Sequence, residues 1–443
     1  MAVRVEEGAV VINHVNQNYI MRKISLGVIG MLLSLCCSYG QGNETSDSSK
    51  YKDRKLTLDE INFVSGYYHQ DGDNSAVTGG IGTENLTDIA NTVDINLSMI
   101  NRKGNKEHFV LEFGIDHYTS ASSDMINPDS SRQQRGKLEY ALTSASREDT
   151  RIYPSLSWSV DNDKRRISYG VGISYSHEFD YYSRGANLHF TKSSKDNNRE
   201  FSIKLLAFLD EWKAIYPFEL RNTVYGGGPG YGDGSTRDTL PVDYKPRNSF
   251  QSTFSLSQVI NRRLNMALIF DPSYMKGQLT TLYQRVYFND GSERVEKLPD
   301  TRLKIAIGIR ANYFLGDRFI IRAFYRFYHD DWGNTAHTAS IETPIKLSSF
   351  VSLSPFYRFN SQSGINYFAP KYAHELNDTY YTSDYDLSKF VSHFIGIGFR
   401  MAPEHGVFGI QALNTLEIRY GHYLRYTGTG LYADIITLAL KFK

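Results

Sequence analysis

Cysteine is almost absent from the sequence. The only two, Cys36 and Cys37, stand side by side near the N-terminus, within a segment that we expect to be removed on export. The mature chain would then contain no thiol, which excludes disulfide bonds, cysteine metal sites and cysteine nucleophiles.

Long hydrophobic runs and an excess of one charge sign are missing as well. Beyond the N-terminal region no apolar run reaches the roughly 18 residues of a transmembrane helix, so helical spans are not expected. The formal net charge of +1 gives no indication of nucleic acid binding or of a polybasic membrane-surface patch. The mean hydropathy of -0.41 does not exclude a membrane β-barrel, because barrel strands show only half of their residues to lipid.

The N-terminus has the three regions of a signal peptide at residues 21–40. Arg22 and Lys23 form the charged start, residues 24–37 the apolar middle, and residues 38–40 a small-x-small cleavage site. The apolar run is too short for a helical anchor. No small residue precedes either cysteine, which argues against a lipoprotein.

The remaining boundaries follow from this assignment. Residues 1–20 are predicted to be an upstream extension that forms no structure. Residues 41–55 are polar and rich in serine and charge, and are predicted to be a flexible leader. Residues 56–443 would form one β-barrel, and 32 Tyr, 25 Phe and 35 Gly beside 12 Pro are typical of a β-rich protein with aromatic girdles.

The clearest strand pattern lies in the segment Leu303–Gly333. Its two arms, joined by a short turn at residues 315–317, alternate apolar with polar or small residues at a period of two rather than 3.6. Each arm keeps this alternation for about 11 residues, which is the length of a tilted strand that crosses a bilayer. The apolar face carries Leu303, Ile305, Ile307, Ile309, Ala311 and Tyr313 in the first arm and Phe319, Ile321, Ala323, Tyr325 and Phe327 in the second.

Segments of the same kind recur to the C-terminus. By our count the chain has about 16 of them, an even number as in single-chain bacterial barrels, and the two arms above are the tenth and eleventh. The others are Leu58–Gln70, Val93–Met99, Phe109–Asp116, Ile152–Val160, Ile167–Phe179, Tyr182–Phe190, Phe201–Trp212, Phe250–Ile260, Leu264–Tyr274, His337–Leu347, Val351–Phe359, Val391–Met401, Leu416–Arg425 and Leu431–Phe442.

The connections sort by length. Even-to-odd connections are short except for Ala402–Thr415, whereas the longest insertions are all odd-to-even: Asp71–Asn91, Thr119–Asp149, Ala214–Arg247, Met275–Asp300 and Ser361–Ser388. We therefore predict an all-β, antiparallel up-and-down transmembrane barrel with short periplasmic turns and long extracellular loops. Phe442 next to the C-terminus resembles the insertion signal of outer-membrane barrels.

The cost of burying charge in lipid, roughly 2 to 4 kcal/mol for a mid-bilayer Arg or Lys, predicts which residues line the lumen. Early strands would supply an acidic wall of Asp94, Glu112, Asp116, Glu178, Asp180 and Asp210. Late strands would supply a basic wall of Arg310, Arg318, Arg322, Arg326, Arg358, Arg400, Arg419 and Arg425. Two interpretations stay open: a transverse field that orients charged or zwitterionic solutes, or walls that pair across a narrow or plugged lumen.

One cluster of candidate metal ligands lies where the hairpin meets its outer loop. His329, Asp330, Asp331 and His337 offer imidazole and carboxylate groups that zinc or iron accepts. They lack the spacing of an established metal motif, so a solvated rim is the preferred interpretation. No catalytic template matches, and we expect neither a metal nor a cofactor.

Two loop sequences match part of a known binding motif, one for calcium and one for phosphate, but lack residues that the motif requires. Asp71–Ser75 starts as a calcium loop does, but Ala76 stands where the loop needs glycine and Gly82 where it needs glutamate. A turn-rich loop or an inward-folded plug is preferred. The run Tyr225–Gly234 lacks the Gly-Lys-Ser/Thr of a phosphate loop and is typical of an exposed loop.

Four strings resemble a family of exported bacterial proteins known only as a domain of unknown function: Gly66–Glu84, Tyr328–Leu347, Asn366–Pro370 and Tyr380–Ser388. The resemblance covers nearly all of the mature chain. It implies an outer-membrane-type barrel of a Gram-negative cell and supplies no established activity or catalytic residue.

A non-enzymatic channel or small-solute transporter of the outer membrane is the first hypothesis. The alternative is a plugged barrel whose loops, or a periplasmic partner, carry the function, and an outer-membrane enzyme comes third. The expected partners are outer-membrane lipid and a small solute that the sequence does not identify, and no nucleic acid.

Overall fold

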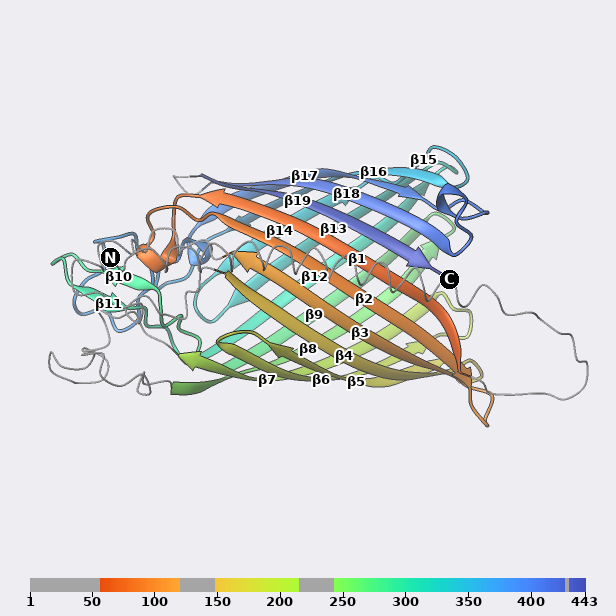
Figure 1. Ribbon diagram of the computed structural model, residues 1–443, viewed down its shortest axis with the longest axis horizontal. Helices are drawn as coiled ribbons and strands as arrows, with labels where there is room; N and C mark the ends of the chain where they lie inside the picture. The colour runs from red at the N-terminus through yellow and green to blue at the C-terminus, as the bar shows by residue number, and fades with distance from the viewer. Residues whose placement is uncertain (1–55, 120–147, 215–242, 427–429) are drawn as a thin grey trace, which may run out of the picture.

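The computed structural model describes residues 56–119, 148–214, 243–426 and 430–443, which form a closed antiparallel β-barrel (Figure 1). The predicted extension, signal peptide and leader at residues 1–55 lie outside the described residues, as does the run Tyr225–Gly234. Within the described part of the chain, no helix has the length and apolar character needed to cross a membrane.

The barrel has 16 strands, as predicted. β14 and β15 count as one strand, because Thr343 and Pro344 interrupt its pairing and proline has no N–H to donate. The strands are β1 Thr57–Gly72, β2 Leu86–Ile100, β3 Lys106–Thr119, β4 Glu148–Asn162, β5 Ile167–His177, β6 Tyr181–Ser193, β7 Arg199–Ala214, β8 Asp243–Asn261, β9 Leu264–Gly277, β12 Thr301–Leu315, β13 Phe319–Asp330, β14 Thr335–Glu342, β15 Ile345–Lys346, β16 Val351–Gln362, β17 Phe390–Met401, β18 Leu413–Tyr426 and β19 Gly430–Phe442.

Closure comes from β1, which pairs with both β2 and β19. Its register with β19 runs from Ile61 opposite Phe442 to Gly72 opposite Leu431. Every barrel strand thus has a partner on both sides, which removes the unpaired backbone groups that lipid cannot satisfy.

The β12–β13 hairpin shows how alternation places the side chains. Ile307 pairs with Phe327 on the outer face, where Ile307 is 50% exposed, and the neighbouring Ala306 is only 2% exposed on the inner face. Gly316 makes the tight turn with a φ of 64°, a left-handed conformation that glycine adopts without strain. The predicted pairing of these two arms is therefore confirmed.

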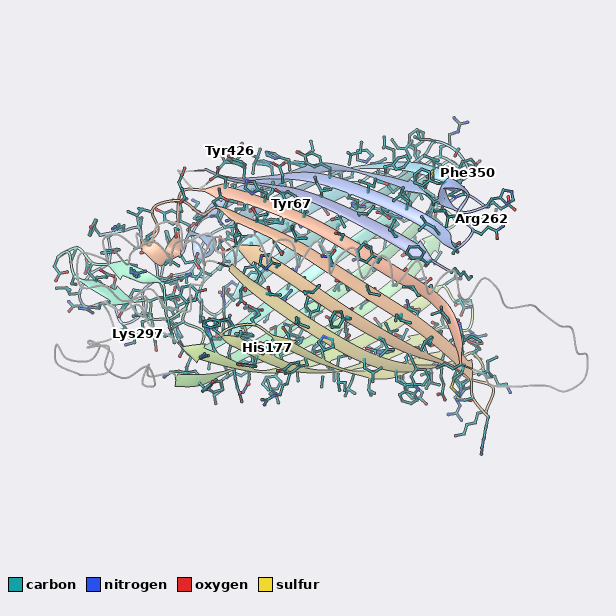
Figure 2. All side chains as sticks on the ribbon, viewed as in Figure 1. Tyr67, His177, Arg262, Lys297, Phe350 and Tyr426 are labelled. Carbon is teal, nitrogen blue, oxygen red and sulfur yellow. The ribbon has the colours of Figure 1, made fainter. Side chains whose placement is uncertain are left out.

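The connections divide between the two ends of the barrel, which we call the long-loop end and the short-turn end. Residues 73–85, 278–300 and 363–389 gather at the long-loop end, where β10 (Arg285–Tyr287) and β11 (Glu293–Val295) form a separate hairpin (Figure 1). The short 3-10 helices η1 (Ala76–Thr78) and η3 (Tyr385–Leu387) lie in the same loops. Figure 2 shows Lys297 at this end and Arg262 and Phe350 at the other.

The one longer turn at the short-turn end folds back against the outer wall. Val407, in the short helix η4 (Val407–Gly409), is fully buried against Ile61, Phe63 and Phe442. This contact also covers Phe442, which is only 6% exposed. The predicted exception among the short connections therefore has a packing role.

Candidate functional site

Strand pairing puts the acidic-wall residues of β2, β3 and β7 on the inner face of the barrel. Asp94 stands opposite Glu112, and Asp116 stands opposite Arg151 on β4. Glu178 and Asp180 lie in the connection between β5 and β6 at the long-loop end. The strands of this wall are contiguous in the first half of the barrel.

The basic wall lies on β12 to β18, in the second half of the barrel. The inner-face pairs continue from strand to strand there, for example Gly308 with Arg326 and Ser340 with Arg358. Arg318 differs from the other seven, because it lies in the exposed turn between β12 and β13 at the short-turn end.

Two acids of the acidic wall, Asp116 and Glu178, have an arginine partner on the adjacent strand β4. Arg151 donates to Asp116 at 2.5 Å and lies 4.0 Å from Glu178, and the hydroxyl of Tyr153 donates to the other oxygen of Asp116 at 2.8 Å. Among the described residues, Asp94 and its directly opposite neighbour Glu112 have no cation partner, and one oxygen of Asp94 is buried without a hydrogen bond.

The basic wall contains its own acids. Glu342 accepts from Arg322 at 3.2 Å and from Arg419 at 3.4 Å, and Arg419 also reaches Glu417 at 3.4 Å. Within the described part of the chain, four inner-face arginines of this wall have no carboxylate partner: Arg310, Arg326, Arg358 and Arg400. The two walls therefore keep charge of opposite sign.

Each wall has a cavity on its inner side. The basic-wall cavity has a volume of about 330 Å³, and its lining includes Glu342, Phe356, Arg358, Phe394 and Arg419. The acidic-wall cavity has a volume of about 290 Å³, and its lining includes Glu112, Arg151, Tyr153, Glu178 and Tyr181. The lining of the basic-wall cavity consists of strand residues, and so does that of the acidic-wall cavity except for Glu178 in the β5–β6 connection, so the barrel strands hold most of both linings in place.

Residues 73–85, 278–300 and 363–389 form a compact cap over the long-loop end. Lys297 and Tyr381 exchange backbone hydrogen bonds of 3.1 and 2.7 Å, which joins the second loop to the third. Arg285 donates to the carbonyl oxygen of Val77 at 2.7 Å, which joins the second loop to the first. Phe288, with none of its surface exposed, packs in a small core of the cap.

Arg425 fastens this cap to the barrel. Its guanidinium pairs with Asp386 of the third loop and, at 3.3 Å, with Glu84 of the first. Only 4% of the Arg425 side chain is exposed. Arg425 thus lies on the inner face of β18 and holds the first and third loops of the cap instead of facing an unfilled lumen.

The segment Asp71–Ser75 runs from the end of β1 into the first loop of the cap. The Ser75 amide donates to the carbonyl of Gly82 at 3.1 Å, and Asn74 forms an isolated bridge with Gly82. The hydroxyl of Tyr432 donates to Asp71 at 2.8 Å. These contacts correspond to the turn-rich loop that was preferred over a calcium loop.

The cap encloses three acids that the sequence patterns do not mark: Glu296 is buried, and Asp384 and Glu84 are partly buried. Burial raises the pKa of Glu296 to about 8, although Glu296 accepts hydrogen bonds from the Thr382 hydroxyl and, at 2.7 Å, from the Thr281 amide. Burial raises the pKa of Asp384 to about 6, and it raises that of Glu84 to about 7 despite Arg425. An isolated acid in a polar loop has no sequence signal, because its burial depends on which loops meet.

The four metal candidates do not come together. The imidazole of His329 contacts the Thr335 hydroxyl at 3.0 Å and that of His337 contacts the Tyr325 hydroxyl at 2.8 Å, both on the outer face. Asp330 points inward, almost fully buried, and pairs with Arg302 at 2.6 Å. The carboxylate of Asp331 accepts from the Leu303 amide at 3.0 Å.

A different carboxylate cluster forms where β4, β5 and β6 end. Single oxygens of Asp149, Glu178 and Asp180 lie within 4.8 Å of one another. Protein donors already engage each of them: the Phe179 amide donates to Asp149 at 3.1 Å, the Tyr118 hydroxyl to Glu178 at 2.8 Å and the Trp212 indole to Asp180 at 3.0 Å. The cluster was missed from sequence because Asp149 is distant along the chain.

Comparison with known proteins gives one family and several similar barrels. The model of a family described as "Protein of unknown function (DUF3570)" matches residues 30–417. No curated protein matches the sequence.

Several solved structures are similar to this chain. A bacterial polysaccharide outer membrane secretin has 10% identity and a TM-score of 0.41, with 87% of this chain and 98% of that chain covered. A BenF-like porin from Pseudomonas fluorescens Pf-5 has 7% identity and a TM-score of 0.41, with 86% and 98% covered. The ferric enterobactin receptor of Pseudomonas aeruginosa has 11% identity and a TM-score of 0.43, with 83% and 53% covered. Identities and TM-scores this low carry no functional information.

Proposed function

The chain belongs to the DUF3570 family of proteins of unknown function, and we propose that it forms an outer-membrane channel for small charged solutes. The main support for this proposal is a set of arginine side chains on the inner face of the barrel that, in the described part of the chain, have no carboxylate partner. Arg310, Arg326, Arg358 and Arg400 lack a carboxylate partner among the described residues. A guanidinium without a partner is costly to remove from water, so these side chains favour a hydrated lumen.

The strand number supports the same function. Barrels of about 16 to 18 strands are wide enough to leave an aqueous channel, whereas barrels of about 8 strands are filled by their own side chains. The outer face presents exposed apolar residues such as Ile307, Leu268 and Ile173, which are suited to contact with outer-membrane lipid.

Opposed walls of opposite charge would orient a solute as it passes. Asp94 and Glu112 stand in the first half of the barrel, and Arg326 and Arg358 stand in the second half. A transverse field of this kind acts on zwitterions and on charged solutes. The cap would control access from the long-loop end, which we assign to the cell exterior.

Planar-bilayer recording of the purified, folded protein tests this function. We expect discrete conductance steps, and we expect the double variant Arg310→Gln/Arg326→Gln to shift the permeability ratio about twofold or more toward cations. Asp94→Asn/Glu112→Gln should shift it toward anions. Arg184→Gln removes an arginine from the outer face, where Arg184 pairs with Glu211 at 3.6 Å, and serves as the matched control with unchanged selectivity.

A capped barrel without conductance is the second candidate, and the compact cap favours it. In that case the cap, or a periplasmic partner, would carry the function. Folded protein that gives no discrete conductance, either as the wild type or with the cap loosened by Arg425→Gln, would support this candidate and overturn the channel.

A further inference from the structure

We propose that the basic-wall cavity is a binding subsite for a small carboxylate with a single flat apolar ring, an inference that rests on the proposed channel function and deepens it. The floor of the cavity is a pair of phenyl rings. Phe356 and Phe394, on the neighbouring strands β16 and β17, have centroids 5.2 Å apart and ring planes at 50°. They offer an apolar surface on the inner face of the barrel.

An arginine side chain lies over each of these two rings. The guanidinium carbon of Arg419 lies 4.9 Å from the centroid of Phe356, and that of Arg358 lies 4.9 Å from the centroid of Phe394. Both arginines and both rings line the same cavity. Positive charge and aromatic surface are therefore presented together.

Two glycines make room for the rings against the wall. Gly396 and Gly421 stand directly opposite each other on β17 and β18. A Cβ at Gly396 would lie 2.3 Å from the Cζ of Phe356, and one at Gly421 would lie 2.5 Å from ring atoms of Phe394. A Cβ at Gly396 would also lie 2.2 Å from the carbonyl oxygen of Tyr420, so a larger residue at this pair of positions would displace the rings or the backbone.

The charges around the cavity select an anion. Glu342 is shared between Arg322 and Arg419, so its charge is already neutralised. Arg358 has no carboxylate partner among the described residues, and its guanidinium lies over the ring of Phe394. Its planar guanidinium matches a carboxylate, which it can bind through two parallel hydrogen bonds.

The apolar surface of the two phenyl rings and the volume of the basic-wall cavity further restrict which ligands would fit. A bare inorganic anion would make no use of the apolar surface of Phe356 and Phe394. An ammonium group is not favoured either, because the carboxylate of Glu342 already pairs with Arg322 and Arg419. A volume of about 330 Å³ is at the lower end of the roughly 300 to 1,000 Å³ of small-molecule pockets. A one-ring carboxylate fits both observations.

Equilibrium titration of the full mature protein in detergent tests this with three probes: phenylacetate, its neutral isostere phenylacetamide, and acetate, which lacks the ring. We expect phenylacetate to bind about tenfold or more tightly than either of the others, because only phenylacetate uses both the charge and the rings. Arg358→Gln should weaken phenylacetate about tenfold and leave phenylacetamide unchanged. Phe394→Leu should weaken phenylacetate while leaving acetate unchanged.

Arg310 supplies the matched control. It too lies over a ring, 5.8 Å from the centroid of Phe324, and has no carboxylate partner among the described residues, but it does not line the basic-wall cavity. Arg310→Gln should leave phenylacetate binding unchanged. Each variant should still migrate at different positions in a detergent gel before and after boiling, which verifies that it is folded.

Equal binding of phenylacetate and phenylacetamide would overturn the subsite, and so would an equal loss in Arg310→Gln and Arg358→Gln, which would indicate general electrostatic attraction. Binding in detergent does not require conduction. Selective binding without conductance would therefore reject the channel alone, and conductance without selective binding would reject the subsite alone.

Discussion

Ile307 lies on the outer face of β12 with half of its surface exposed. Lys304, on the same strand, points to the inner face opposite Asp330. We expect Ile307→Lys to cost roughly 2 to 4 kcal/mol, because it places an ammonium group against lipid hydrocarbon, and to reduce the yield of inserted protein. Lys304→Ile is the matched control and should insert normally. The fraction of each variant that inserts into membranes checks this prediction. Equal insertion of the two variants would mean that Ile307 and Lys304 are assigned to the wrong faces of the barrel.

Single residues of the basic wall differ in role. Arg358 and Arg310 lie over aromatic rings, Arg419 shares Glu342 with Arg322, and Arg425 fastens the cap. The same residue type at the same strand periodicity therefore serves binding, wall charge or loop attachment, according to what the neighbouring strands and loops bring near it.

The closed state of the cap is expected to depend on pH. Burial raises the pKa of Glu296 to about 8, of Glu84 to about 7 and of Asp384 to about 6. In an opened cap these acids would return to ordinary values near 4. Between those ordinary values and the raised ones the closed cap binds more protons than the opened cap, so its stability is greatest at low pH and falls as pH rises.

We therefore expect the closed cap to be weakened as the pH is raised from about 5 to about 8. Amide exchange in residues 278–300 and 363–389, corrected for intrinsic rates, should show protection that falls by about tenfold or more over this range. Glu296→Gln keeps a hydrogen-bonding group of the same size without the charge and should flatten the pH dependence. Protection that is constant with pH in the wild type would contradict this account.

Continuous strand pairing closes the whole barrel into a single sheet. β1 closes the sheet against both β2 and β19, so no edge is available at which unfolding can begin. We expect the protein to fractionate with outer membranes and, in detergent gels, to migrate at a different position before and after boiling. Recovery as a soluble periplasmic protein with a single gel mobility would refute the membrane barrel.

Much of the barrel was predictable because its signals are local. Period-two alternation marks each strand and its lipid face, as in Ile307 and Ala306, since neighbouring residues of a strand point to opposite faces. Loop lengths mark the two ends of the barrel. Together they determine the strand number, the order of pairing and the wall on which an arginine such as Arg326 lies.

The side-chain contacts within the cap and the basic-wall cavity depend on the tertiary structure and could not be predicted from the sequence. Arg425 meets Glu84 and Asp386, the cap loops bury Glu296, and Phe356 and Phe394 lie over Gly396 and Gly421, although nothing local in the chain links these residues. Each contact joins segments from different strands or loops and depends on strand register and loop packing. Alternation and loop length along the chain are enough to predict a barrel with charged inner walls, whereas strand register and loop packing set which of those charges are paired, buried or free to meet a solute.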